Sequence, residues 1–175
     1  MKSQATIEKA VATLRRKHKA TTFPIDIWGL AEKEGVSVHL EDLEDKVSGA
    51  LFAQDGSAVM AINSNHAPRR QRFTIGHELG HYVLHWRGGD ATAFVDGSLV
   101  LRRDERSKDG SLDMEREANA FAAELLMPRA EIERLTKSED FDPQDDIVLR
   151  KLSGIFGVSE TALLVRLASL RIVEL

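Results

Sequence analysis

The sequence predicts an α+β fold, in which a small three-stranded sheet packs against helices and a helical C-terminal extension follows. The length of 175 residues suits one domain with a small appendage, because single hydrophobic cores usually serve about 100 to 200 residues. Apolar residues recur at helical spacing towards both ends of the chain. Between them lie three short apolar runs that have the length of strands.

The N-terminal part is expected to contain two helices and the three strands. In the first helix, Ile7, Val11 and Leu14 share one face. The turn Gln-Asp-Gly separates the last two apolar runs, which we therefore expect to pair antiparallel. The expected helices are 5–18 and 24–35, and the expected strands are 36–40, 49–53 and 58–62.

The remainder is expected to be mainly helical. A long helix covers about 68–85, and a second begins at Asp113 as its N-cap and stops before Pro128. Three more helices are expected in 129–175, the last capped by Ser159. The intervening segment 86–112 has weak periodicity, with a possible strand at 93–95 or 99–101, and is a candidate lid.

Composition excludes several classes of function. The chain has no cysteine, so disulfide frameworks, thiolate zinc fingers and cysteine nucleophiles are ruled out, and a bound metal must use nitrogen and oxygen ligands. The net charge of −4 offers no overall basic field for a nucleic-acid backbone, so direct nucleic-acid binding is not expected. No run reaches the roughly 20 apolar residues that cross a bilayer. We expect a cytoplasmic protein without a membrane segment.

The most informative motif is His77-Glu78-Leu79-Gly80-His81 in the long predicted helix. Residues four apart on a helix are separated by about 40° around its axis, so both imidazoles can converge on one ion. Zinc lowers the pKa of water to about 7, and Glu78 at the flank of this face can take the proton. Gly80 would weaken the helix, and its natural use is the close approach of another element or a substrate.

Two histidines leave a catalytic zinc one protein ligand short of three. The next long helix offers Glu115, Glu117 and Glu124. Its periodicity does not choose between the first two, since Glu115 falls inside the apolar stripe and Glu117 at its edge beside Phe121.

Two long blocks of sequence resemble the ImmA/IrrE family of metallopeptidases, over about residues 25 to 130. They are Arg72-Phe-Thr-Ile-Gly-His-Glu-Leu-Gly-His81 followed by Leu84-His85, and Glu117-Ala-Asn-Ala-Phe-Ala-Ala-Glu-Leu-Leu-Met-Pro128. The resemblance implies a metallopeptidase domain at 1–130, with a helical extension at 131–175 packed on it. It also implies a gluzincin-type site in which His77, His81 and Glu117 hold Zn²⁺ and Glu78 is catalytic, with Glu115 as the alternative ligand.

The same resemblance implies a zinc-dependent endopeptidase that cleaves a regulatory protein, namely a helix-turn-helix transcriptional repressor. The alternative is a non-proteolytic, zinc-containing toxin or regulatory binding module paired with a helix-turn-helix antitoxin. In either case the expected partner is a helix-turn-helix protein.

Two further residues of the long helix are weighed against this site. His85 follows His81 by one helical turn and could contact substrate or replace the glutamate ligand, but a polar residue at the exposed helix end is favoured. Tyr82 lies on the side of the helix opposite Gly80 and is expected to pack.

The segment 149–167 looks like a helix-turn-helix without an excess of basic residues, so partner docking or core capping is favoured.

Overall fold

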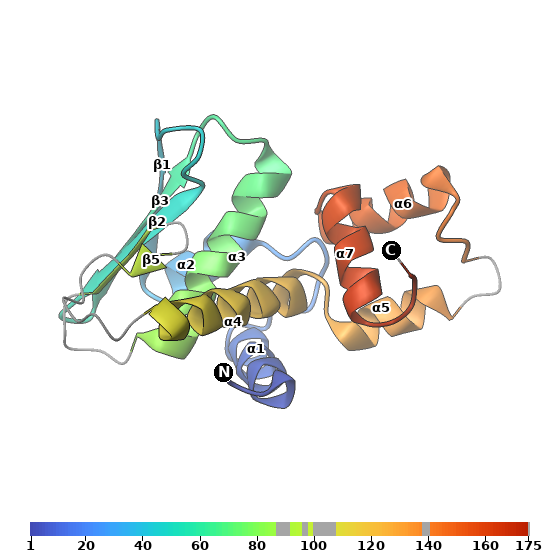
Figure 1. The fold of residues 1–175 in the computed structure, drawn as a ribbon, viewed down its shortest axis with the longest axis horizontal. Helices are drawn as coiled ribbons and strands as arrows, with labels where there is room; N and C mark the ends of the chain where they lie inside the picture. The colour runs from blue at the N-terminus through green and yellow to red at the C-terminus, as the bar shows by residue number, and fades with distance from the viewer. Residues whose placement is uncertain (87–91, 96–97, 100–107, 138–140, 175) are drawn as a thin grey trace.

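The computed structural model describes residues 1–86, 92–95, 98–99, 108–137 and 141–174, and these residues form an α+β fold. Helices and strands are mixed along the first part of the chain, and helices alone make up the second (Figure 1). The elements are α1 (Gln4–Lys17), α2 (Ile27–Lys33), β1 (Val36–Glu41), β2 (Gly49–Gln54), β3 (Ser57–Asn63), α3 (Pro68–His85), β4 (Thr92–Val95), β5 (Ser98–Leu99), α4 (Lys108–Leu126), α5 (Arg129–Thr136), α6 (Asp146–Phe156) and α7 (Glu160–Ser169).

The described strands form one mixed sheet in the order β1-β3-β2-β4-β5. The β2–β3 hairpin is antiparallel as expected, while β1 runs parallel to β3. The expectation of three strands was too low, because β4 and β5 extend the sheet beyond β2. The possible strand at 93–95 is confirmed as β4, whereas β5 is only 2 residues long and too brief to show a strand period in a segment rich in Gly, Asp and Arg.

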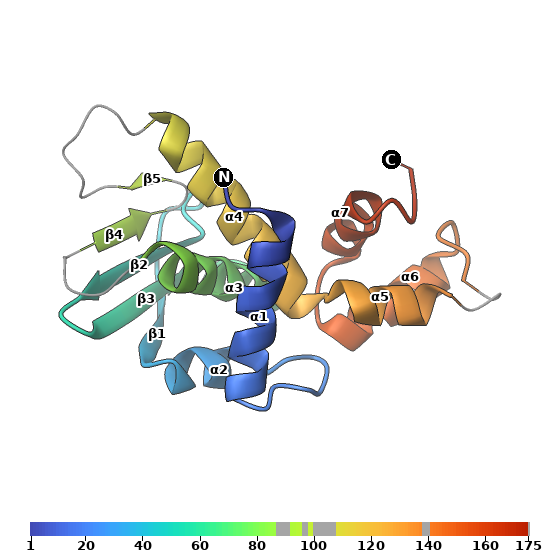
Figure 2. The same ribbon diagram turned by 90° about the horizontal axis from the view of Figure 1, so that it is seen from below.

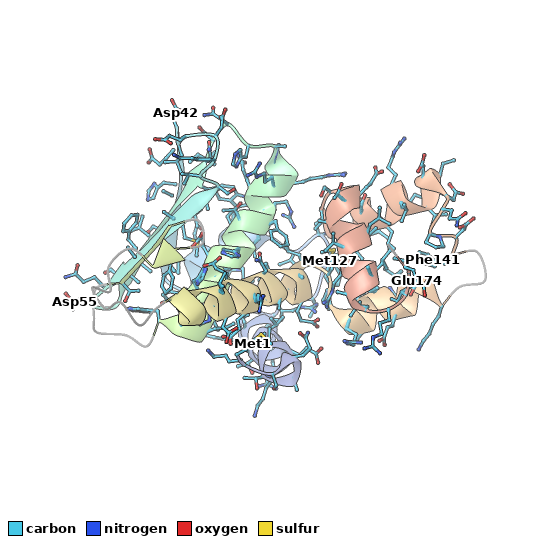
Figure 3. The ribbon with its side chains drawn as sticks, in the orientation of Figure 1. Met1, Asp42, Asp55, Met127, Phe141 and Glu174 are labelled. Atoms are coloured by element: carbon cyan, nitrogen blue, oxygen red, sulfur yellow. The ribbon has the colours of Figure 1, made fainter. Side chains whose placement is uncertain are left out.

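One face of the sheet packs on α3. Leu51 of β2 and Met60 of β3 are fully buried on this face and belong to the same core as Ile75 and Leu79 of α3. Phe52 and Val59, which alternate with them, point to the other face and are 49% and 41% exposed. The hairpin tip at Asp55, labelled in Figure 3, lies at the end of the sheet remote from the C-terminal helices. The sheet therefore has one covered and one open face.

Helix α4 crosses α3 at very close range, and α1 lies against α4 (Figure 2). A Cβ placed on Gly80 would lie 2.9 Å from Cα and 3.1 Å from the carbonyl oxygen of Ala118. The expectation of a close approach at Gly80 is therefore confirmed, and the approaching element is α4. The absence of a side chain at this position allows the two helices to come this near.

The C-terminal helices α5, α6 and α7 form a cluster on the side of α3 and α4 away from the sheet (Figure 1). The three expected helices are present, and the side chain of Ser159 accepts a hydrogen bond from the backbone N–H of Ala162 as the N-cap of α7. Met127, labelled in Figure 3 at the junction, is buried in the common core. These helices therefore pack on the rest of the chain.

A buried ion pair also joins α4 to α7. The guanidinium of Arg166 donates to the carboxylate of Glu124 and, through Nε, to the carbonyl oxygen of Met127 at 3.1 Å. Both side chains are at most 10% exposed. Helix α7 is thus held to α4 by a buried ion pair in addition to apolar contacts.

The start of α4 differs from the expectation, and the expectation of a lid concerns residues that are mostly outside the described part of the chain. Helix α4 begins at Lys108, so Asp113 lies inside the helix and is not its N-cap. Most of the candidate lid, residues 87–91, 96–97 and 100–107, lies outside the described residues.

Among the described helices, none is long and apolar enough to cross a membrane alone; only α6 and α7 taken together, bent by 92°, meet that criterion of length and composition.

Candidate metal centre

Helix α3 carries three histidines on one face, one turn apart. Pro68 occupies its first turn, where the missing N–H costs nothing, and the helix continues without a break to His85. The ring centroids of His77 and His81 are 4.7 Å apart, and those of His81 and His85 are 5.2 Å apart. Their side chains are 13%, 1% and 3% exposed, respectively. Such buried imidazoles require polar partners.

The side chains of His77, His81 and Glu115 converge on one point. The Nε2 atoms of the two histidines are 3.0 Å apart, and the carboxylate oxygens of Glu115 lie 3.2 Å from Nε2 of His77 and 3.0 Å from Nε2 of His81. Zinc–ligand bonds of about 2.0–2.1 Å in a tetrahedron place neighbouring donor atoms about 3.3 Å apart. The three donor atoms match that spacing closely, and two imidazoles with one carboxylate are a donor set that zinc accepts.

The structure does not bring Glu117, the expected third ligand, to this group. Its carboxylate instead accepts hydrogen bonds from Nε2 of His85 at 3.0 Å and from Nζ of Lys2 at 3.0 Å, and from the backbone N–H of Lys2. Residues two apart on a helix project about 200° from each other, so α4 presents only one of the two carboxylates to His77 and His81. That residue is Glu115, the alternative that the sequence left open.

Each of the two histidines at the centre also has a partner at its other ring nitrogen. Nδ1 of His77 lies 3.1 Å from Oδ1 of Asn119, and Nδ1 of His81 lies 3.1 Å from Nδ1 of His85. Partners at the outer nitrogen are typical of metal-ligating histidines, since they fix the tautomer and the ring orientation. Asn119 was not singled out from the sequence, although it lies one turn after Glu115, on the same face of α4.

Phe94 of β4 completes the surroundings of His81. The two rings stack with centroids 4.5 Å apart and planes at 23°. Phe94 is buried, and its ring also lies near that of His85, with centroids 6.3 Å apart. Because β4 falls in the weakly periodic segment, the sequence carried no signal for this contact.

The charges of the three converging groups are coupled. Burial alone would raise the pKa of Glu115, but hydrogen bonds from His77 and His81 lower it to about 2. Burial lowers the pKa of His81, an effect that Glu115 only partly offsets. For His77, burial is outweighed by the hydrogen bond to Glu115 and the nearby charges of Glu78 and Glu115, so its pKa is raised. Glu115 is thus an anion, ready to balance the charge of a cation.

Glu78 is 1% exposed and lies beside this cluster. It lines a pocket of about 260 Å³ together with His77, Glu115, Asn119 and Arg70. The catalytic residue expected from the sequence and two of the converging side chains therefore border the same small space.

The expectations for the other two residues of α3 have different outcomes. The preference for His85 as a polar residue at an exposed helix end was wrong, because its side chain is buried between His81 and Glu117. Burial lowers the pKa of His85 to about 4, in spite of its hydrogen bond to Glu117. Tyr82 packs as expected: its ring stacks on Trp86, and its hydroxyl donates to the carbonyl oxygen of Glu34 at 3.4 Å.

Comparison with known proteins identifies the family of this chain. The family described as Peptidase_M78, IrrE N-terminal-like domain, matches residues 31–168, which include α3, α4 and most of the C-terminal helices. An uncharacterized immunity region protein 2 of Bacillus phage phi105 is 32% identical over 122 residues, covering 70% of this chain and 68% of the phage protein. The match to the family spans well over half of the chain, and the chain therefore belongs to the Peptidase_M78 family, the IrrE N-terminal-like domain.

Proposed function

We propose that this protein is a zinc-dependent endopeptidase whose ion is held by His77, His81 and Glu115. The observation that carries the proposal is the convergence of their donor atoms within 4.8 Å of one another, with Glu78 beside them in the same pocket. Membership of a metallopeptidase family supports it. A zinc ion bound there supplies Lewis acidity, which polarises a peptide carbonyl and makes water easier to deprotonate.

The side chains have separate tasks in this proposal. The two histidines bind as neutral imidazoles through Nε2, and Glu115 brings the negative charge. Glu78 accepts the proton of the attacking water and returns it to the leaving amine as general base and then general acid. Its neighbours His77 and Glu115 would hold the ion within reach of the Glu78 carboxylate, which is buried and shielded from bulk water.

A large groove next to the site supports a polypeptide as substrate. It has a volume of about 1210 Å³, and its walls come mainly from α3, α4 and α7, with Phe73, Ala123 and Val165 among its apolar residues. Arg70, Phe73 and Asn119 line both this groove and the small pocket of Glu78, so the two spaces are adjacent. The groove is too large for a short side chain alone, and an apolar segment of a substrate protein would fill it.

The regulatory context comes from the phage relative. That protein is named for an immunity region. We infer that the substrate is a helix-turn-helix transcriptional repressor, which the protein cleaves in the cytoplasm. In this proposal residues 1–130 form the peptidase unit, and 131–175 form an extension whose α7 contributes one wall of the substrate groove.

The test uses the purified chain and the helix-turn-helix repressor encoded nearest to its gene. The two proteins are incubated with zinc, with excess EDTA, and with EDTA followed by zinc, and the repressor is then analysed by intact-mass spectrometry. We expect cleavage at one or a few sites that EDTA stops and zinc restores. An intact repressor in the zinc-loaded incubation contradicts the proposed substrate, and cleavage that persists in EDTA contradicts the proposed chemistry.

The same incubation addresses the alternative of a non-proteolytic toxin or binding module. A stable complex with the repressor, detected by size-exclusion chromatography, together with an intact repressor in all incubations would favour that alternative. The bound zinc would then be structural, and EDTA would lower the melting temperature without any change in proteolysis.

A further inference from the structure

We propose that His85 and Glu117 are positioning residues for the metal site, acting through His81. This inference rests on the proposed function, since it assumes that His81 binds the ion through Nε2. The contacts run in one line: Nδ1 of His81 lies 3.1 Å from Nδ1 of His85, and Nε2 of His85 lies 3.0 Å from a carboxylate oxygen of Glu117.

When Nε2 of His81 binds an ion, only one placement of the protons on the rings of His81 and His85 satisfies both hydrogen bonds. His81 must then carry its proton on Nδ1, and it donates that proton to Nδ1 of His85. His85 in turn carries its proton on Nε2 and donates it to Glu117, which is an acceptor. Each nitrogen has one role, and the carboxylate at the end fixes the direction of both hydrogen bonds. A metal-ligating histidine oriented in this manner is a stronger and better-placed ligand.

The three side chains that form these two hydrogen bonds are buried. The side chains of His81, His85 and Glu117 are 1%, 3% and 5% exposed, so bulk water cannot replace either partner. An acceptor lost from this place leaves a buried N–H without a hydrogen bond, which is costly. The charge of Glu117 is balanced on its other side by Lys2, through the backbone N–H and through Nζ at 3.0 Å.

The two ligand histidines are supported differently. His77 faces the amide oxygen of Asn119, whereas His81 faces an imidazole backed by a carboxylate. A carboxylate behind a ligand raises its basicity more than a neutral amide does. The structure thus gives Glu117 a task distinct from that of Glu115, although the two residues belong to the same helix.

The test measures zinc affinity in the metal-free full-length chain by competition with a chromophoric chelator. His85→Phe keeps a ring of similar size and removes the acceptor, while His85→Gln keeps an acceptor. We expect His85→Phe to bind zinc about 10- to 100-fold more weakly than wild type, and His85→Gln to recover most of that loss. Glu117→Gln is expected to fall between wild type and His85→Phe. The exposed His39 supplies the matched control, since His39→Gln is expected to leave the affinity unchanged.

A second measurement does not depend on any variant. Imidazole ¹⁵N–¹H correlation spectra of the zinc-loaded wild type identify the tautomers, and we expect a proton on Nδ1 of His81 and on Nε2 of His85. The opposite tautomer of His85, or equal zinc affinity of wild type and a folded His85→Phe, overturns the inference while the proposed peptidase stands. Wild type that binds no stoichiometric zinc overturns the proposed function itself. If His85→Phe does not fold by circular dichroism, Glu117→Gln and the spectra decide.

Discussion

The carboxylates of Glu115 and Glu117, two residues apart in α4, contact different histidines of α3. Glu115 lies 3.0 Å from Nε2 of His81, on the side where His77 also points. Glu117 instead lies against His85 and Lys2. The pair therefore separates a proposed metal ligand from a residue that supports one.

The first prediction compares these two carboxylates. Glu115→Gln removes the only anionic donor of the proposed ligand set, so zinc affinity should fall by more than the about 10- to 100-fold typical of a supporting residue. Glu117→Gln serves as the matched control and should still hold one zinc per chain. Metal content after dialysis against a defined zinc concentration, measured by elemental analysis, distinguishes them. The reverse order of zinc content would return the ligand role to Glu117.

The second prediction concerns Glu78. Glu78→Gln keeps the size of the side chain but not its basicity, so it should bind zinc as wild type does and lose about 100- to 10,000-fold in the rate of repressor cleavage. Rates are measured by mass spectrometry at saturating zinc, with metal content determined on the same samples. A variant that cleaves at the wild-type rate would show that Glu78 does not handle the proton.

The third prediction concerns the close contact at Gly80. Gly80→Ala introduces a methyl group 2.9 Å from Cα of Ala118 and 3.2 Å from Cβ of Phe121, so α3 and α4 must separate. We expect a loss of about 1–3 kcal/mol in the free energy of unfolding, measured with denaturant.

Gly154 of α6 is the matched control for Gly80, because a methyl group added there would have no atom within 4 Å among the described residues outside its own helical turn. Gly154→Ala should stabilise the protein by about 0.5–1 kcal/mol through the better helix propensity of alanine. Equal effects of the two substitutions would contradict the proposed crowding between α3 and α4.

The fourth prediction concerns the ion pair between Glu124 and Arg166. Arg166→Met leaves the buried carboxylate of Glu124 without its countercharge, which typically costs about 3–5 kcal/mol. The double variant Glu124→Gln with Arg166→Met removes both charges and should be more stable than Arg166→Met alone. Urea unfolding of the wild type, of the single variants Glu124→Gln and Arg166→Met, and of the double variant forms a double-mutant cycle. An additive cycle would mean that the two side chains do not interact.

The fifth prediction is a pH dependence at the contact between α1 and α2. Burial would raise the pKa of Glu34, but hydrogen bonds from Lys17 and His18 and their charges lower it overall. A carboxyl group with a lowered folded-state pKa stabilises the protein above its unfolded value of about 4.5, and this contribution is lost as the pH falls through the folded value.

Glu34→Gln should therefore show a smaller decrease in stability than wild type when the pH is lowered from about 6 towards about 3. The measurement is the midpoint of denaturant unfolding at a series of pH values. Parallel curves for the two proteins would exclude a contribution from this carboxylate.

The helical period predicted the parts of the site that depend on a single element. Convergence of His77 and His81 follows from a spacing of four residues, whatever the rest of the chain does. The choice between Glu115 and Glu117 depends on how α4 is rotated relative to α3. That rotation is set by packing across the interface, including the contact at Gly80, and a pattern within one helix does not contain it.

The sheet likewise has strands that can be predicted from their own residues and strands that depend on contacts with the rest of the chain. The runs that became β1, β2 and β3 have enough apolar residues to be recognised, and the turn before Gly56 fixes their hairpin. The residues of β4 and β5 are too few to show a period, so the sequence offered only a possible strand at 93–95 or 99–101; β4 is defined by its pairing with β2, and β5 by its pairing with β4. Phe94 therefore reaches His81 through a tertiary contact that the sequence did not predict.

Helix α4 spans 19 residues, about 28 Å of stiff rod at 1.5 Å per residue. Glu115 lies in its first half, and Glu124, which binds Arg166 of α7, is near its C-terminal end. Helix α7 is therefore fastened to the same stiff element that carries the carboxylate of Glu115. The attachment of α7 and the placement of Glu115 beside His77 and His81 thus depend on one and the same helix.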